Sequence, residues 1–328
     1  MEIDLAGAGK QVGRVVFPLD EPFQGRSEIA LPVCVIANGK GPAVSLWGGN
    51  HGDEYEGPTV MGQLARELDP AAVEGRLLIL PAINPPALQN RSRTSPIDGK
   101  NMNRVWPGDR QGTITERIVA WLADSVLPAS DVLMDCHTGG DALELIPMSM
   151  SHHTDDAAER ARITAAHLSF NAPLCVELRL GANRATAAGC AHERGLLVIG
   201  SESGGGHPVS PASLANCYFG IRNTLAHLEM LPAPPAPGRP RHATRFTRKW
   251  GHQAEMLSDS DGIFIPFRGL WDEVEEGEPA GQIIPRDQPF EAPRTLHFPA
   301  SGLIAGRAAR SGVAAGDVLY WVVRDAEG

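Results

Sequence analysis

His51 and Glu54 stand in a glycine-rich turn directly after an apolar run at residues 43–47. The apolar run predicts a buried strand, and glycine lets the backbone turn sharply where a strand ends. Open α/β sheets bind ligands at the carboxyl ends of their strands, so both side chains lie where a ligand is expected. An imidazole and a nearby carboxylate can hold one metal ion, but a catalytic zinc ion needs a third protein ligand.

His137 is the candidate for that third ligand, because it ends a second apolar run, residues 131–137, which glycines again follow. Strand alternation places Asp135 and His137 on one face of this strand and Cys136 on the other. Two histidines and one glutamate are the donor set of a catalytic zinc that keeps one position for water. The alternative is two unrelated polar histidines in glycine-rich loops, which the matched strand-end contexts disfavour.

A long polar loop at residues 84–109 carries three arginines and several amides. Arg91, Arg93 and Arg104 each offer a planar pair of donors that matches a carboxylate. Solvent exposure alone explains many surface arginines, but Asn103 and Arg104 directly before Trp-Pro-Gly favour a binding role. Loops of this length without regular structure are usually functional or disordered.

Metal-assisted hydrolysis also needs a base that takes a proton from water. Glu202 follows the apolar run 196–199 and precedes three glycines, so it is expected at the same edge of the sheet. Glu144 and Glu177 are its rivals. Glu177 stands beside Arg179 in a predicted strand, where a structural ion pair is an equal interpretation.

Several motifs in order resemble the succinylglutamate desuccinylase/aspartoacylase family, which is related to the carboxypeptidase A-type zinc peptidases. The matching segments are Asn50-His51-Gly52-Asp53-Glu54, Asn84-Pro85-x-Ala87, Asn103-Arg104-x-x-Pro107-Gly108 and Asp135-x-His137. The resemblance implies one Zn²⁺ per chain on His51, Glu54 and His137. It also implies a role for each of four further residues: Arg93 polarises the scissile carbonyl, Asn103 and Arg104 bind the substrate carboxylate, and Glu202 is the general base.

The chain departs from the family pattern at two places. Asn101 stands where the family usually has aspartate, and the spacing between Arg93 and Arg104 is longer than in aspartoacylase. Arg91 is therefore an alternative to Arg93 for the polarising role. The Ser-Glu-Ser-Gly-Gly-Gly segment around Glu202 and the Trp-Pro-Gly segment resemble the bacterial N-acetyl-diaminobutyrate deacetylase branch of ectoine breakdown.

Strands that alternate with helices predict an α/β fold, a mixed and mostly parallel sheet sandwiched by helices. The family resemblance implies that this fold is like that of zinc carboxypeptidases. Residues 1–231 are the predicted catalytic domain, 232–240 a Pro-rich linker, and 241–328 a small all-β domain. Similar segments at 274–281 and 312–319 predict that this domain resembles the barrel-sandwich domains of biotinyl and lipoyl carriers. A carrier needs a modifiable lysine, and none follows Lys249.

Composition excludes several classes of protein. The chain has 328 residues, is 42% hydrophobic and carries a formal charge of -10 without any Lys/Arg run, which argues against nucleic acid as a partner. No apolar stretch approaches the roughly 20 residues that span a bilayer, so no membrane partner is expected. The start of the chain lacks the pattern of a signal peptide, and five scattered cysteines indicate reduced thiols in the cytoplasm.

The predicted function is that of a zinc-dependent amidohydrolase, a deacylase that removes an acetyl, succinyl or similar group from a small N-acyl amino acid. Two alternatives use the same residues: a zinc carboxypeptidase that acts on peptides, and a non-catalytic zinc-binding protein. The sequence leaves open the acyl group, the amino acid, the role of the C-terminal domain and the oligomeric state, a homo-oligomer included.

Overall fold

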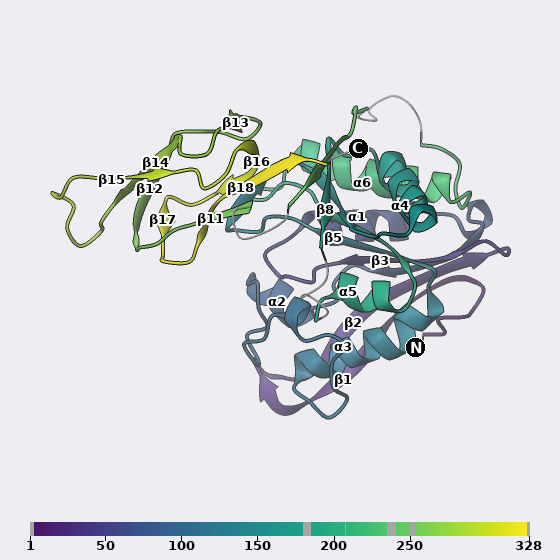
Figure 1. Cartoon of the computed structure of the whole chain (residues 1–328). Coiled ribbons are helices and arrows are strands. Elements are labelled where there is room, and N and C mark those ends of the chain that lie inside the picture. The colour runs from purple at the N-terminus through teal and green to yellow at the C-terminus, as the bar shows by residue number, and fades with distance from the viewer. Residues whose placement is uncertain (1–2, 180–184, 207, 235–240, 250–253, 327–328) are drawn as a thin grey trace.

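The structure, a computed structural model, describes residues 3–179, 185–206, 208–234, 241–249 and 254–326 (Figure 1). The strands of its N-terminal half are β1 (Gly9–Phe23), β2 (Arg26–Asn38), β3 (Ala43–Gly48), β4 (Gly75–Leu80), β5 (Val132–His137), β6 (Leu143–Leu145) and β7 (Met148–His152). Those that follow are β8 (Leu174–Leu178), β9 (Leu197–Glu202), β10 (Arg245–Arg248), β11 (Glu255–Leu257), β12 (Gly262–Pro266), β13 (Glu273–Val274), β14 (Pro279–Ile284), β15 (Arg294–His297), β16 (Gly302–Ala308), β17 (Gly312–Val313) and β18 (Val318–Asp325).

The helices flank a mixed sheet in the main body of the molecule. They are α1 (Glu56–Glu67), α2 (Pro85–Asn90), α3 (Ile114–Trp121), α4 (Ala157–Phe170), α5 (Ala187–Glu193) and α6 (Pro211–His227). Strands lie in the order β1-β2-β4-β3-β5-β9-β7-β8-β10-β18-β16-β13. The neighbours β4, β3, β5 and β9 run parallel, so their carboxyl ends meet at one edge of the sheet. The predicted mixed α/β sheet with helices is confirmed.

Each face of the sheet has its own apolar core, because alternate residues of a strand point to opposite faces. On one face Val132, Met134 and Cys136 of β5 pack with residues of α1, α4 and α6. On the other face Leu133 packs with α3 and α5, together with Trp47 and Trp106. These two layers fix β5 from both sides, and they leave Asp135 and His137 on the Leu133 face, as the alternation predicts.

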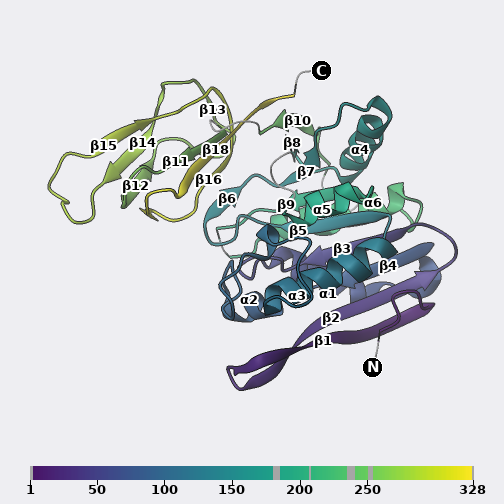
Figure 2. The same ribbon diagram turned by 60° about the horizontal axis from the view of Figure 1, so that its bottom comes forward.

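A small separate antiparallel sheet lies near the C-terminal end of the chain, with strand order β15-β14-β12-β17. In Figures 1 and 2 it projects to one side of the main body. Strands β16 and β18 belong to the main sheet instead, and β16 pairs with β6, which follows the His137 turn. Arg307 of β16 and Glu144 of β6 form an ion pair with a separation of 2.7 Å. The C-terminal strands are therefore joined to a segment beside the predicted site.

Some local expectations were wrong. The loop at 84–109 contains α2 and a 3-10 turn at Met102–Arg104, so it is less irregular than expected. The apolar segment 142–150 forms two strands, β6 and β7, because Pro147, which cannot donate to a ladder, lies between them. Strand β10 pairs in parallel with β8 in the main sheet. Residues 235–240 of the predicted linker lie outside the described residues, and the domain boundaries stay a prediction.

The structure also bears on the thiols and on the membrane. All five cysteines are buried and free. Within the described ranges, no helix is both long enough and apolar enough to cross a bilayer.

Candidate metal centre and active site

The turn between β3 and α1 presents His51 and Glu54, and close backbone packing fixes its shape. A Cβ atom on Gly52 would lie 1.9 Å from the carbonyl carbon of Ala87 in α2. The backbone N–H of Gly52 donates to the carbonyl oxygen of Ser92 at 2.9 Å. Only glycine fits this approach, so the identity of residue 52 positions both candidate ligands.

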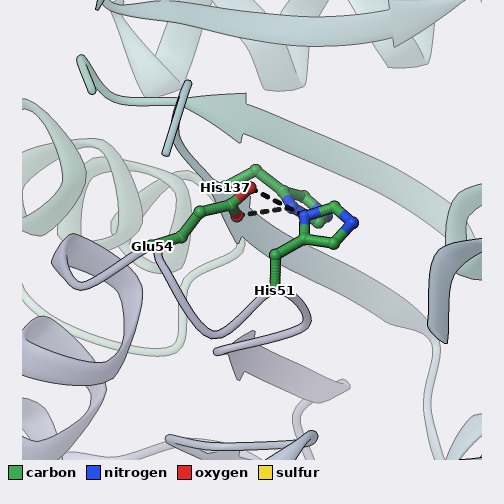
Figure 3. A group of neighbouring side chains, drawn as sticks. All are labelled: His51, Glu54 and His137. Atoms are coloured by element: carbon green, nitrogen blue, oxygen red, sulfur yellow. Dashed lines mark hydrogen bonds and ion pairs between the residues drawn. The ribbon is translucent and has the colours of Figure 1, made fainter. Parts of the chain in front are cut away.

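Three side chains from β5 and this turn converge at the carboxyl edge of the sheet (Figure 3). Glu54 Oε1 lies 2.7 Å from His51 Nδ1, and Glu54 Oε2 lies 2.9 Å from His137 Nδ1. The three donor atoms lie within 4.8 Å of one another, and all three residues are buried. These three residues were predicted from the sequence to meet, and in the structure they do.

The Nε2 atom of each imidazole also lies close to an oxygen atom. Asp135 Oδ2 lies 2.9 Å from His137 Nε2, and Asn101 Oδ1 lies 3.3 Å from His51 Nε2. Oxygen acceptors behind a metal-binding histidine fix its ring and its tautomer. Asn101, the departure from the family pattern, thus contacts His51 directly.

The donor set fits a divalent ion such as Zn²⁺. Both nitrogens of each ring face oxygen atoms. A neutral imidazole carries a proton on only one nitrogen, so its other nitrogen would face an acceptor oxygen with no hydrogen atom between them. A cation between the three inner donor atoms removes that conflict. Burial raises the pKa of Glu54, but His51 and His137 outweigh it and hold the pKa below its usual value. Two histidines and a carboxylate are ligands that zinc prefers.

Glu202 ends β9 and lies beside His137 of β5 in the parallel register. Its Oε2 atom is buried and has no hydrogen-bond partner among the described residues. Burial raises the pKa of Glu202 to about 8, with Glu54 adding to the rise, whereas His137, Arg93 and Lys249 oppose it. This carboxyl group lies beside the candidate ligands, and its Oε2 atom has no partner in the part of the chain that the structure describes. It can therefore exchange a proton with a water molecule.

The two rivals of Glu202 are engaged elsewhere. Glu144 pairs with Arg307 across β6 and β16. Glu177 Oε1 lies 3.3 Å from His153 Nδ1. Neither contact involves the three candidate ligands.

Arg93 and Arg91 take different positions. The Arg93 guanidinium approaches Glu54 Oε1 at 3.5 Å, and about half of its side chain is exposed. Arg91 has φ +56° at the end of α2, and its charge acts on Tyr55. Of the two, Arg93 is the one in contact with a candidate metal ligand.

Asn103 and Arg104 lie in the 3-10 turn that follows. Asn103 Oδ1 accepts a hydrogen bond of 2.8 Å from the N–H of Ala187 at the start of α5, so its oxygen is already occupied. Burial lowers the pKa of Arg104, and the nearby charge of Arg93 lowers it further, while Glu255 opposes the shift. The two guanidinium groups therefore form a positive region beside the candidate centre.

Sequence reasoning missed Lys249 and Glu255. Lys249 Nζ lies 2.5 Å from Glu255 Oε1 and 3.4 Å from the centre of the Trp321 ring. Burial lowers the pKa of Lys249, although Glu255 and Glu202 raise it, so the lysine lies within range of Glu202. The one available signal was a lysine in a chain whose cations are mostly arginine.

Residues 40–228 match the family model described as the succinylglutamate desuccinylase/aspartoacylase catalytic domain. This match covers more than half of the chain. The chain belongs to that family. The family consists of metal-dependent amidohydrolases that act as deacylases, so the resemblance read from the motifs is confirmed.

Relatives match over almost the whole chain. The N-α-acetyl-L-2,4-diaminobutyric acid deacetylase of Halomonas elongata is 32% identical, over 97% of this chain and 92% of the relative. A succinylglutamate desuccinylase/aspartoacylase structure from Rhodobacter sphaeroides has 34% identity and a TM-score of 0.92, covering 100% and 99% of the two chains. The product-bound ectoine utilization protein EutE (DoeB) from Ruegeria pomeroyi has 33% identity and a TM-score of 0.92, covering 98% and 97%.

Proposed function

We propose that this chain is a zinc-dependent deacylase that hydrolyses the amide bond of a small N-acyl amino acid, with an N-acetylated diamino acid as its preferred substrate. The main support for this proposal is the buried group of His51, Glu54 and His137. Next to it lies Glu202, whose Oε2 atom is buried and has no hydrogen-bond partner among the described residues. The deacetylase from Halomonas elongata and the product-bound EutE (DoeB) relative support the choice of substrate.

His51, Glu54 and His137 would hold the zinc ion, with Asp135 and Asn101 fixing the two rings. When bound, zinc supplies a Lewis acid and a positive charge that favours the ionised form of nearby carboxyl groups.

Glu202 acts as general base and then as general acid. Its carboxylate takes a proton from the attacking water and later gives that proton to the leaving amine nitrogen, so the products are a carboxylate and a free amino acid. Arg93 donates from its guanidinium to the oxygen of the scissile carbonyl, where negative charge develops. The buried Oε2 atom of Glu202 is shielded from bulk water during this proton transfer.

Charged groups around the centre match an amino acid substrate. Arg104 binds the substrate carboxylate through its planar pair of donors, with Asn103 fixing the turn that carries it. Arg91, earlier in the same loop, is the alternative to Arg93 as the group that polarises the carbonyl. Glu255 is an acidic group whose charge acts on Arg104, and it would contact the side-chain ammonium group of a diamino acid.

A substrate panel tests this function. Protein stripped with a chelator and reloaded with zinc is incubated with N-acetyl and N-succinyl derivatives of 2,4-diaminobutyrate, aspartate, glutamate and alanine, and release of free amine is measured. We expect the N-acetyl diamino acid to give the highest kcat/KM and the stripped protein to give no release. Cleavage of peptides in preference to every panel member would favour the carboxypeptidase alternative. Zinc binding without any cleavage would favour a non-catalytic protein.

We also propose a cytoplasmic location. Five buried free cysteines support it, because thiols stay reduced in that compartment.

A further inference from the structure

A second group with the same donor set lies outside the centre described above. His152 at the end of β7, Glu159 in α4 and His192 in α5 present donor atoms that all lie within 4.8 Å of one another. These three elements are labelled in Figure 2. Strand β7 is antiparallel to β9 with Met148 opposite Glu202, so four residues of strand, roughly 13 Å, separate His152 from that end.

The distances in this group fit an ion better than they fit hydrogen bonds. Glu159 Oε1 lies 3.7 Å from His152 Nε2 and 3.9 Å from His192 Nδ1, beyond hydrogen-bonding range. Nitrogen and oxygen ligands of a tetrahedral zinc ion lie about 3.4 Å from each other, so Glu159 Oε1 is within about 0.5 Å of that separation from each of the two nitrogens. The two imidazole rings pack against each other with their centres 4.0 Å apart and tilted by 52°.

The buried, unpartnered nitrogen of His152 indicates that this group binds a ligand. Its side chain is 5% exposed, and its Nε2 atom is buried without a hydrogen-bond partner among the described residues. An unsatisfied buried polar atom costs about 1–3 kcal/mol, so such atoms in native proteins usually have a partner, an ordered water or an ion. The nitrogen faces a carboxylate oxygen that is too far away to satisfy it.

The carboxylate is held in the orientation that a metal needs. Thr154 Oγ1 donates to Glu159 Oε2 at 2.5 Å, which leaves Oε1 facing both histidines. Asp156 Oδ1 accepts from the N–H of Glu159 at 2.8 Å and caps α4. Side chains of Glu159 and His192 are 30% and 31% exposed, so an ion and a water ligand can reach the group.

We propose that His152, Glu159 and His192 form a second site for a zinc-class divalent ion that links β7, α4 and α5 without taking part in catalysis. The charge of Arg162 acts on His152 and opposes a cation there. The single carboxylate of Glu159 offsets it.

Metal content measured on purified, chelator-stripped and zinc-dialysed protein tests the site. We expect two zinc ions per chain in the wild type and one in His192→Ala or Glu159→Gln, with turnover of both variants within about 2-fold of wild type. His227→Ala, a histidine at the exposed end of α6, is the matched control and keeps two ions. His137→Ala is expected to keep one ion, in the second site, which separates this proposal from the catalytic one.

Cobalt replacement gives an independent readout. We expect Co²⁺ added to His137→Ala to produce visible absorption that His137→Ala/His192→Ala lacks. One zinc ion in the wild type, or two in folded His192→Ala, would overturn the proposal. Equal absorption of the single and double variants would do the same.

Discussion

Asp135 is the residue whose role depends most on a single contact, the 2.9 Å approach of its Oδ2 atom to His137 Nε2. An asparagine at this position keeps the size of the side chain but removes the charge that orients the ring. Outer partners of this kind usually contribute 10–100-fold to metal affinity.

Asp135→Asn is therefore expected to weaken zinc binding at the catalytic centre about 10–100-fold and to retain activity at saturating zinc. Titration of the stripped variant with zinc, followed by turnover, measures this. Asp131→Asn, which alters the start of the same strand, is the control and keeps wild-type affinity. Unchanged affinity in Asp135→Asn would mean that the contact does not orient the ligand.

At the scale of elements, the metal-binding turn depends on α2, which packs against Gly52. The Cβ atom of Gly52→Ala would lie 1.9 Å from Ala87, so the turn or the helix has to move. A displacement of about 1 Å in a catalytic group costs on the order of 100-fold in rate, and we expect Gly52→Ala to lose at least that much.

Gly62→Ala is the matched control for this change. Gly62 lies in α1, where an added Cβ atom meets only the end of the Arg66 side chain at 3.4 Å. Alanine favours helix over glycine, so the control is expected to keep full activity and a melting temperature at or above wild type. Full activity in Gly52→Ala would contradict the close packing between turn and helix.

Helix α4 contains a buried histidine that makes the fold sensitive to acid. His167 is 0% exposed and both of its ring nitrogens lack hydrogen-bond partners among the described residues. Burial lowers its pKa to about 3, with His152 adding to the shift, so the folded state keeps it neutral where the unfolded chain is protonated. The free energy of unfolding should therefore fall with decreasing pH from about 6.5 to 3, by up to about 1.4 kcal/mol per pH unit.

His167→Leu removes the imidazole that titrates, and it breaks no hydrogen bond of that ring among the described residues. Urea unfolding of chelator-treated wild type and variant at pH 7.5, 5.5 and 4.5 measures the difference in stability. We expect the variant to gain on the wild type as the pH falls. A difference that stays constant over this range would show that His167 titrates normally in the folded state.

At the scale of the whole molecule, the region that begins with β10 reaches the active site. Glu255 and Lys249 follow the main helices of the chain, yet the charge of Glu255 acts on Arg104 and that of Lys249 acts on Glu202. If Glu255 contacts the side-chain ammonium group of the substrate, its removal should affect charged substrates selectively.

Glu255→Gln is expected to raise KM for the N-acetyl diamino acid about 10-fold, since a partly exposed charge-assisted hydrogen bond is lost. KM for N-acetylalanine, which lacks the ammonium group, is the control and should change little. Equal effects on both substrates would assign Glu255 to holding Lys249 instead.

Sequence patterns could predict what depends on local spacing. Apolar runs ending in glycine gave β3 and β5, and strand alternation put Asp135 and His137 on one face, because these features need only a few neighbouring residues. Helix α5 was not predicted, since its seven residues are too few for an apolar period to show. Pairs such as Lys249 with Glu202 depend on the packing of distant segments, which no local pattern encodes.

Zinc content and turnover of Glu202→Gln, measured on the same sample, test most directly whether Glu202 moves the proton beside a zinc ion held by His51, Glu54 and His137. We expect the variant to bind as much zinc as the wild type and to lose about 10²–10⁴-fold in kcat, the range typical for a lost general base. Wild-type turnover at full zinc occupancy would contradict the assignment of the base, and loss of zinc would show that Glu202 holds the ion.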